Sequence, residues 1–215
     1  MKKVTLSLFL LVSVLTLNAQ QASRSPEVSL VFGLNQPIVT QGFNVEVNYW
    51  MKKFVIDYSH GFGLKFRDNL VTQEARDQKI AFNITHSLGI GFGYRFTERF
   101  NLRVEPKLHV WEVYYDDAFK TSQGKITTYN TFTLGLGAYY RWTPFEKHDN
   151  VLKGLTIVPS ARWWPNVASS LKNDEYEYLN SRTQQMETHR ANNIGVSNTA
   201  FFVNVSIGYT IGVGK

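Results

Sequence analysis

The last strand-like segment, residues 201–213, constrains the fold more than any other part of the sequence. Its odd-numbered residues are all apolar, whereas its even-numbered residues, the other parity of the strand, are small or polar apart from Phe202. The apolar parity comprises Phe201, Val203, Val205, Ile207, Tyr209, Ile211 and Val213. Because successive side chains of a strand point to opposite faces, the segment has one apolar face and one small, uncharged face. That combination is typical of a strand in a closed membrane barrel.

The N-terminus has the plan of a secretory signal peptide. Lys2 and Lys3 precede an apolar run over residues 4–17, and Leu17-Asn18-Ala19 supplies permitted residues before a cleavage site. The run is too short to span a bilayer as a helix. We therefore expect a signal peptide over 1–19 with cleavage near Ala19, a short periplasmic segment over 20–26, and one barrel domain over 27–215.

Charge and cysteine content exclude several classes of protein. The formal net charge is +6, and loss of Lys2 and Lys3 with the signal peptide leaves +4 because residues 1–19 hold no acidic side chain. No basic run is present, so a nucleic-acid partner is not expected. The chain has no cysteine and must be stabilised by a core or a closed strand ladder. We find no metal-ligand spacing and no glycine-rich phosphate loop, so we predict no cofactor and no metal.

Alternation with a period of two recurs along the chain and predicts eight strands. They span residues 28–35, 42–51, 54–66, 87–96, 100–116, 127–142, 155–164 and 201–213. Short connections alternate with longer, polar connections, which span residues 67–83, 119–126 and 172–196. The connection over residues 36–41 is the exception, because it is short although it belongs with the longer ones. The sequence therefore predicts an all-β, eight-stranded antiparallel up-and-down transmembrane β-barrel. Its short turns and both termini would be periplasmic, and its longer loops would lie outside the cell.

Aromatic residues gather near the strand ends, as expected for two belts at the membrane interfaces. The predicted outer belt comprises Phe32, Phe43, Phe62, Phe66, Tyr129, Trp163 and Phe201, and Leu64 is assigned to the outward face. The predicted periplasmic belt comprises Tyr49, Phe54, Tyr94, Phe96, Phe100, Tyr140, Trp142 and Tyr209. Pro106 and Pro159 lie mid-strand, where we expect bulges or bends because proline removes a ladder donor.

Two glycine-rich strands carry a resemblance to known proteins. Residues 88–96 read LGIGFGYRF and residues 134–142 read LGLGAYYRW. Across residues 27–215 the pattern resembles the small outer-membrane barrels typified by outer membrane protein X and by the membrane domain of outer membrane protein A. The signal peptide and the glycine-rich strands look like those of Bacteroidota, a Gram-negative group. The resemblance implies a non-enzymatic outer-membrane barrel with an envelope-structural or surface-interaction role, monomeric, and in contact with lipid and lipopolysaccharide.

Charged side chains on the inward parity are the first candidate functional set. They include Glu46, Asp57, Arg95, Arg103, Glu105, Lys107, Arg141 and Arg162. An eight-stranded barrel is just wide enough to be filled by side chains, so we expect an ion-paired interior plug. We further expect Arg95, Arg141 and Arg162 to share the carboxylates of Glu46, Asp57 and Glu105. The alternative is a pore that excludes cations.

The second candidate set lies where strands five and six exceed the length needed to cross a membrane. The surplus should project as a hairpin carrying Trp111, Val113, Tyr115 and Tyr129, with a shift of parity near Glu112. An exposed edge with aromatic side chains could bind a partner strand. The alternative is a solvated hairpin without a partner.

Two further roles are alternatives to these. An accessory subunit of a secretion machine would resemble the PorT family of similar barrels. A lipid A-modifying enzyme would need a nucleophile and base. Ser59–His60 and His86–Ser87 are adjacent pairs whose members face opposite sides of a strand and cannot bond to each other. Asp116, Asp117 and His189 echo the acidic and histidine pairs of omptin proteases but are better explained as solvated loop residues. We predict no catalytic residue.

Overall fold

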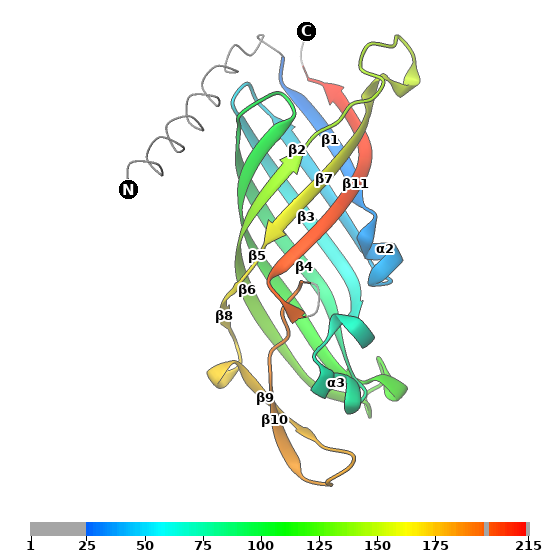
Figure 1. Cartoon of the computed structure of the whole chain (residues 1–215), viewed down its shortest axis with the longest axis vertical. Coiled ribbons are helices and arrows are strands. Elements are labelled where there is room, and N and C mark those ends of the chain that lie inside the picture. The colour runs from blue at the N-terminus through cyan, green and yellow to red at the C-terminus, as the bar shows by residue number, and fades with distance from the viewer. Residues whose placement is uncertain (1–24, 196–197, 214–215) are drawn as a thin grey trace, which may run out of the picture.

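The computed structural model describes residues 25–195 and 198–213, and in it eight long strands close into an antiparallel barrel (Figure 1). Each strand pairs with the next, and β1 pairs with β11 to complete the circle. The eight are β1 (Glu27–Gly33), β2 (Phe43–Trp50), β3 (Phe54–Phe66), β4 (Ile80–Arg95), β5 (Phe100–Tyr115), β6 (Lys125–Tyr140), β7 (Leu155–Trp163) and β11 (Phe201–Gly212). The predicted fold class is confirmed. The predicted signal peptide lies outside the described residues.

Smaller elements occupy the connections. A short strand, β8 (Asn166–Ser169), continues along β6 after β7 ends, and β9 (Glu175–Leu179) pairs with β10 (Met186–Arg190) as a separate hairpin. The helices are α2 (Asn35–Val39), α3 (Gln73–Asp77), η1 (Asp68–Leu70), η2 (Asp116–Ala118), η3 (Val151–Gly154) and η4 (Lys172–Asp174). No helix among the described residues is long and apolar enough to cross a bilayer. Seven of the observed strands begin and end within two residues of the predicted bounds, but β4 begins seven residues earlier than predicted.

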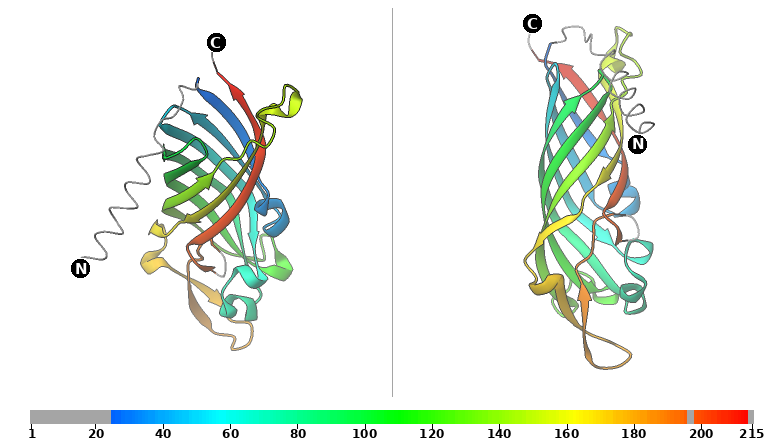
Figure 2. Two further views of the ribbon diagram at one scale, coloured as in Figure 1. Left: turned by 45° about the horizontal axis from the view of Figure 1, so that its top comes forward. Right: turned by 60° about the vertical axis from the view of Figure 1, so that its left-hand side comes forward.

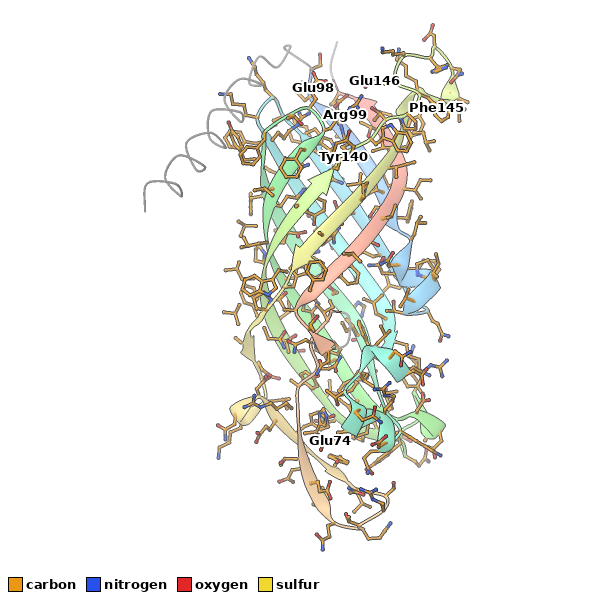
Figure 3. All side chains as sticks on the ribbon, in the orientation of Figure 1. Glu74, Glu98, Arg99, Tyr140, Phe145 and Glu146 are labelled. Atoms are coloured by element: carbon orange, nitrogen blue, oxygen red, sulfur yellow. The ribbon has the colours of Figure 1, made fainter. Side chains whose placement is uncertain are left out.

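The barrel has an apolar exterior and a polar interior, the reverse of a water-soluble protein. Most of its outward-facing aliphatic and aromatic side chains are between 36% and 57% exposed, whereas the alternating residues are buried and mostly polar or charged. Such a continuous exposed apolar surface is stable when lipid covers it. Figure 3 shows Glu98, Arg99 and Glu146 at the end of the barrel where β1 begins and β11 ends, and Glu74 at the opposite end.

The barrel wall is uneven in height at the end where β1 stops and β11 begins (Figure 2). β3, β4, β5 and β6 extend well beyond β1, β2, β7 and β11 there. This high side of the wall forms an open curved sheet. Its concave face is covered by a segment that we call the cap, which consists of α3 and residues 171–194 with the β9–β10 hairpin.

Two irregular positions turn side chains of the high wall inward. Gly63 in β3 has a φ of +66°, a conformation that glycine adopts readily, and the register of β4 shifts between Ile84 and His86. Beyond these positions Leu64, Phe66 and Ile84 are buried beneath the cap. The predictions that Leu64 faces outward and that Phe66 belongs to the outer aromatic belt are therefore wrong. Tyr129, also assigned to that belt, is buried in the same core.

The two mid-strand prolines leave gaps in the pairing without shifting its register. β4 and β5 pair in one register on both sides of Pro106, but no pair joins them at that residue. Pro159 keeps its pairing with Val205, while β6 and β7 are unpaired beside it. The expected bulge is absent from both sites within the described strands. A proline lacks one donor and so loses its bond to one neighbour only.

Candidate functional site

Arg103 lies at the centre of the barrel interior, fully buried among side chains from three strands. Its Nη1 donates hydrogen bonds to Glu46 Oε1 at 2.8 Å, to Asn48 Oδ1 at 2.6 Å and to Asp57 Oδ2 at 3.0 Å. Arg162 Nη2 reaches the other oxygen of Glu46 at 3.4 Å. Because β2, β3, β5 and β7 each supply a member, these ion pairs tie together strands on opposite sides of the barrel.

Lys107 extends this cluster toward the cap. Its ammonium donates a hydrogen bond to Ser59 Oγ at 2.7 Å and lies 3.7 Å from Glu105 Oε1. Glu105 also accepts a hydrogen bond from Trp164 Nε1 at 3.2 Å. We call Glu46, Asp57, Arg103, Glu105, Lys107 and Arg162 the interior ion-pair cluster.

The other two predicted interior arginines lie nearer the end of the barrel where β1 begins and β11 ends. Arg95 Nη1 donates to the main-chain oxygen of Met51 at 2.6 Å, and its Nη2 donates to that of Glu98 at 3.0 Å. Arg141 forms an ion pair with Glu27 at 2.7 Å. The expectation that Arg141 shares the central carboxylates is therefore wrong, and Arg103, absent from that expectation, is their main partner.

Three buried aromatic rings fill the space between the cations. The guanidinium carbon of Arg103 lies 3.9 Å from the centre of the Tyr139 ring, and that of Arg141 lies 4.7 Å from the Trp50 ring. Lys107 Nζ lies 4.3 Å from the Trp164 ring. Cation–π contacts of this kind are strongest where water is excluded. The alternation within residues 42–51 and 155–164 places Trp50 and Trp164 on the inward face but gives them no role, and Tyr139 lies on the inward parity of residues 127–142.

Inward-facing glycines provide the room for these large side chains. A Cβ atom added at Gly91 would overlap the carboxylate of Asp57, and one added at Gly135 would overlap the indole of Trp164. The repeated glycines on the inward parity, visible in the sequence, are therefore the complement of the charged and aromatic side chains on neighbouring strands.

The predicted partner-binding hairpin is part of an internal core instead. Trp111 and Val113 are fully buried, Tyr129 is 2% exposed, and all three lie in the hydrophobic core under the cap. Tyr115 donates its hydroxyl hydrogen to the main-chain oxygen of Leu179 in β9 at 2.9 Å. The register of β5 shifts between Val113 and Tyr114, next to Glu112, where a shift of parity is predicted. Trp111, Val113 and Tyr129 are therefore buried inside the molecule, and Tyr115 is bonded to the cap from a partly exposed position.

Aromatic stacking joins the hairpin to the cap. The rings of Trp111 and Tyr129 lie 5.9 Å apart and nearly parallel, and Tyr176 of β9 stacks on Tyr129 at 6.3 Å. Trp111 Nε1 donates to Thr131 Oγ1 at 2.9 Å. Burial, with a hydrogen bond to Glu187, raises the pKa of Tyr178 to about 12. Tyr178 therefore stays neutral to well above physiological pH, which suits a buried core.

The catalytic candidates are not assembled into a site. Ser59 is buried in the interior, whereas His60 is on the outer face, where its Nε2 lies 3.2 Å from His86 Nδ1. Asp116 pairs with Lys65 at 3.0 Å, and Asp117 follows it in η2. His189 contacts Thr72 and Tyr176 in the cap. Within residues 25–195 and 198–213, no group of three histidines or carboxylates could hold a metal.

Comparison with known proteins returns structural similarity alone. No family model and no curated protein sequence matches the chain. Among solved structures, it is similar to Ail, the attachment invasion locus protein of Yersinia pestis, at 11% sequence identity and a TM-score of 0.39. The same protein in complex with the heparin analogue sucrose octasulfate gives 12% identity and a TM-score of 0.39. Each alignment covers 87% of this chain and 97% of the other.

Proposed function

We propose that this chain is an integral outer-membrane protein whose closed barrel holds a folded cap on the cell surface, in a non-enzymatic role in surface interaction. The observation that carries this proposal is the division of the molecule into an apolar outer band, a charge-paired interior and a structured cap at one end. Lipid and lipopolysaccharide would surround the band, and the protein would act as a monomer. A protein partner would meet the outer surface of the cap.

The exposed side of the β9–β10 hairpin is the part of the cap best placed for a partner. Tyr176 and Tyr178 point to the core, so the alternating residues of β9 and β10 face away from it. Among these, Leu179 and Met186 are exposed apolar side chains on paired positions of the two strands. The opposite face of the hairpin is packed against the core, so the hairpin is fixed in position. Exposed apolar residues on its free face are therefore suited to binding a partner.

An epitope-accessibility experiment tests the proposed orientation. An epitope inserted after Arg182, at the exposed tip of the β9–β10 hairpin, should bind antibody on intact cells. The same epitope inserted after His148, in the exposed turn before η3, should bind only after the outer membrane is permeabilised. Antibody binding to the second site on intact cells would contradict the proposed orientation. Recovery of the protein in the soluble periplasm would contradict the membrane location.

A planar-bilayer recording tests whether the barrel conducts ions. Because Arg103, Trp50 and Tyr139 are buried at the middle of the barrel and packed against one another, the purified protein should show no steady conductance. Its barrel should also migrate faster on a gel when unboiled than when boiled, which verifies that the recorded sample is folded. A steady, anion-selective conductance from folded protein would favour the alternative of a pore.

A further inference from the structure

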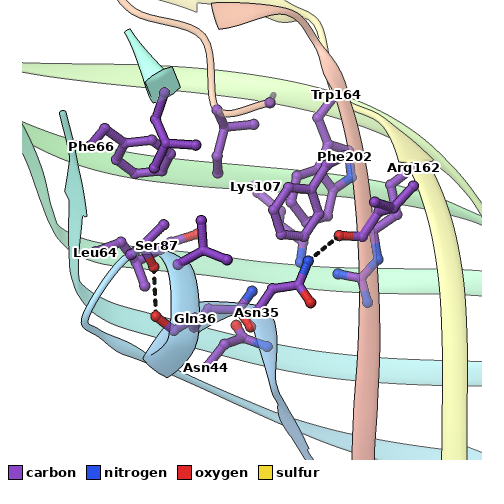
Figure 4. A pocket seen from close by; sticks show the side chains of 16 residues that line it. Asn35, Gln36, Asn44, Leu64, Phe66, Ser87, Lys107, Arg162, Trp164 and Phe202 are labelled. Atoms are coloured by element: carbon purple, nitrogen blue, oxygen red, sulfur yellow. Dashed lines mark hydrogen bonds between the residues drawn. The ribbon is translucent and has the colours of Figure 1, made fainter. Parts of the chain in front are cut away.

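The pairing between β3 and β4 is interrupted at Gly63, and the interruption has an inner and an outer side. On the inner side, Leu64 and Ser87 line a cavity of about 210 Å³ (Figure 4). On the outer side lie His60 of β3 and His86 of β4, which are diagonal neighbours across the two strands. Long side chains at diagonal positions of an antiparallel pair can reach each other. The strand register therefore holds the two imidazole rings side by side.

Both histidines lie where the lipid-facing band ends. His86 is exposed, and His60 is partly exposed. His86 pairs with Val110 of β5, and the next residue of β5 in the same alternation is Glu112, whose carboxylate is bonded to Lys125. The outer face of the barrel thus changes from apolar to charged at this level, so water reaches the two rings.

The ring nitrogens that face each other have the separation of two ligands of one metal ion. His60 Nε2 lies 3.2 Å from His86 Nδ1, and the ring centres are 5.5 Å apart. Two nitrogens bound to one Zn²⁺ or Cu²⁺ at about 2.0–2.1 Å lie roughly 2.8–3.4 Å from each other, depending on whether the angle at the metal is square-planar or tetrahedral. Phe62 packs edge-on against the His60 ring at 5.9 Å and restricts its movement. The pair is therefore positioned for chelation before any ion binds.

The hydrogen bond between the two rings has to open for a metal ion to bind. One of the two facing nitrogens carries the hydrogen that the other accepts. Because neutral imidazole has two tautomers, that hydrogen can move to the second nitrogen of its own ring, and both facing nitrogens then offer a lone pair. The rings turn toward the ion, which shortens the distance between their centres to about 5 Å. His86 is exposed, so its ring can turn without disturbing the barrel interior.

We propose that His60 and His86 together bind one divalent transition-metal ion, with Cu²⁺ bound most tightly. Neutral imidazole is a good ligand for Cu²⁺, Ni²⁺ and Zn²⁺, and nitrogen sites favour Cu²⁺ over the other two. Mg²⁺ and Ca²⁺ require oxygen ligands, which the two rings do not supply. Water completes the coordination from the exposed side. The two histidines are 26 positions apart, so no ligand spacing in the sequence predicts the site, and it has one protein ligand fewer than a group of three.

Titration of the full mature chain with CuCl₂ in phosphatidylcholine nanodiscs tests this proposal. The chain carries no affinity tag, and binding is measured by isothermal titration calorimetry and by electron paramagnetic resonance. One equivalent of Cu²⁺ should bind, and its resonance spectrum should show coupling to two imidazole nitrogens. A hundredfold excess of Mg²⁺ should leave the bound Cu²⁺ in place, whereas an excess of Zn²⁺ should displace it.

Three matched variants assign the ligands. His60→Gln and His86→Gln each remove one ligand, and each should weaken Cu²⁺ binding at least tenfold and abolish the two-nitrogen coupling. His148→Gln removes an exposed histidine from the turn before η3 and should leave both readouts unchanged. All three must retain the faster migration of the unboiled barrel. Equal affinity in the three variants, or displacement of Cu²⁺ by Mg²⁺, would overturn the site. Absence of saturable binding would show that the two rings only hydrogen-bond to each other, and would overturn it as well.

Discussion

Replacing Arg103 with methionine is expected to lower the free energy of unfolding by about 3–5 kcal/mol, the usual cost of removing one partner from a buried ion pair. Arg103 donates to both Glu46 and Asp57 through one nitrogen, so its loss leaves two buried carboxylates without their main counter-charge. Urea unfolding in lipid vesicles, followed by tryptophan fluorescence, measures the change. The exposed Arg182→Met at the hairpin tip should alter the same free energy by less than about 0.5 kcal/mol.

A compensated variant separates the stranded charge from the loss of side-chain volume. Combining Arg103→Met with Glu46→Gln and Asp57→Asn removes the two carboxylates that the single change leaves unpaired. Buried ion pairs can often be replaced by neutral groups at little cost. The triple variant should therefore recover most of the lost stability, although Arg162 then loses its contact with Glu46. A triple variant that is less stable than Arg103→Met would show that shape rather than charge dominates at this position.

The barrel was predictable from the sequence because its pattern is local. Each strand alternates between lipid-facing apolar residues and inward polar or small ones, and this period is visible without knowledge of any partner strand. The inward assignment of Glu46, Arg103 and Lys107 follows from the same alternation. Which cation meets which carboxylate depends on strand register and barrel stagger, and no local pattern encodes these. Hence Arg141 was assigned to the wrong carboxylates.

The cap was not predictable for a related physical reason. Trp111 and Tyr129 look like surface aromatics on a projecting hairpin if the long loop over 172–196 is taken as solvated. They are buried only because this loop, which follows the hairpin by more than 40 residues in the sequence, folds back onto it. That is a contact between segments distant in the sequence. The one-residue irregularities at Gly63 and near Ile84 also reverse the facing of the residues beyond them. A glycine inside a strand pattern was the available signal for the first of these.

Replacing Trp111 with alanine is expected to destabilise the cap by about 3–5 kcal/mol while leaving the barrel closed. Trp111 is fully buried and its ring contacts those of Phe66, Phe82 and Tyr129. The variant leaves a cavity beneath β9 and β10. These two strands pair only with each other and not with any strand of the barrel, so pairing does not hold them in place. Amide hydrogen exchange of β9 and β10 should accelerate by roughly 100-fold or more, since each factor of ten corresponds to about 1.4 kcal/mol of local opening.

The matched control for the cap is Trp163→Ala, which removes the same ring from the lipid-facing end of β7. Trp163 is 52% exposed, so its loss creates no cavity under the cap, and exchange in β9 and β10 should remain at the level of the unmodified protein. The faster migration of the unboiled barrel should persist in both variants. If Trp111→Ala left exchange in the hairpin unchanged, the cap would be held by contacts other than this core. If it abolished the faster migration, the core would be needed to close the barrel, because β4, β5 and β6 supply part of it and also belong to the wall.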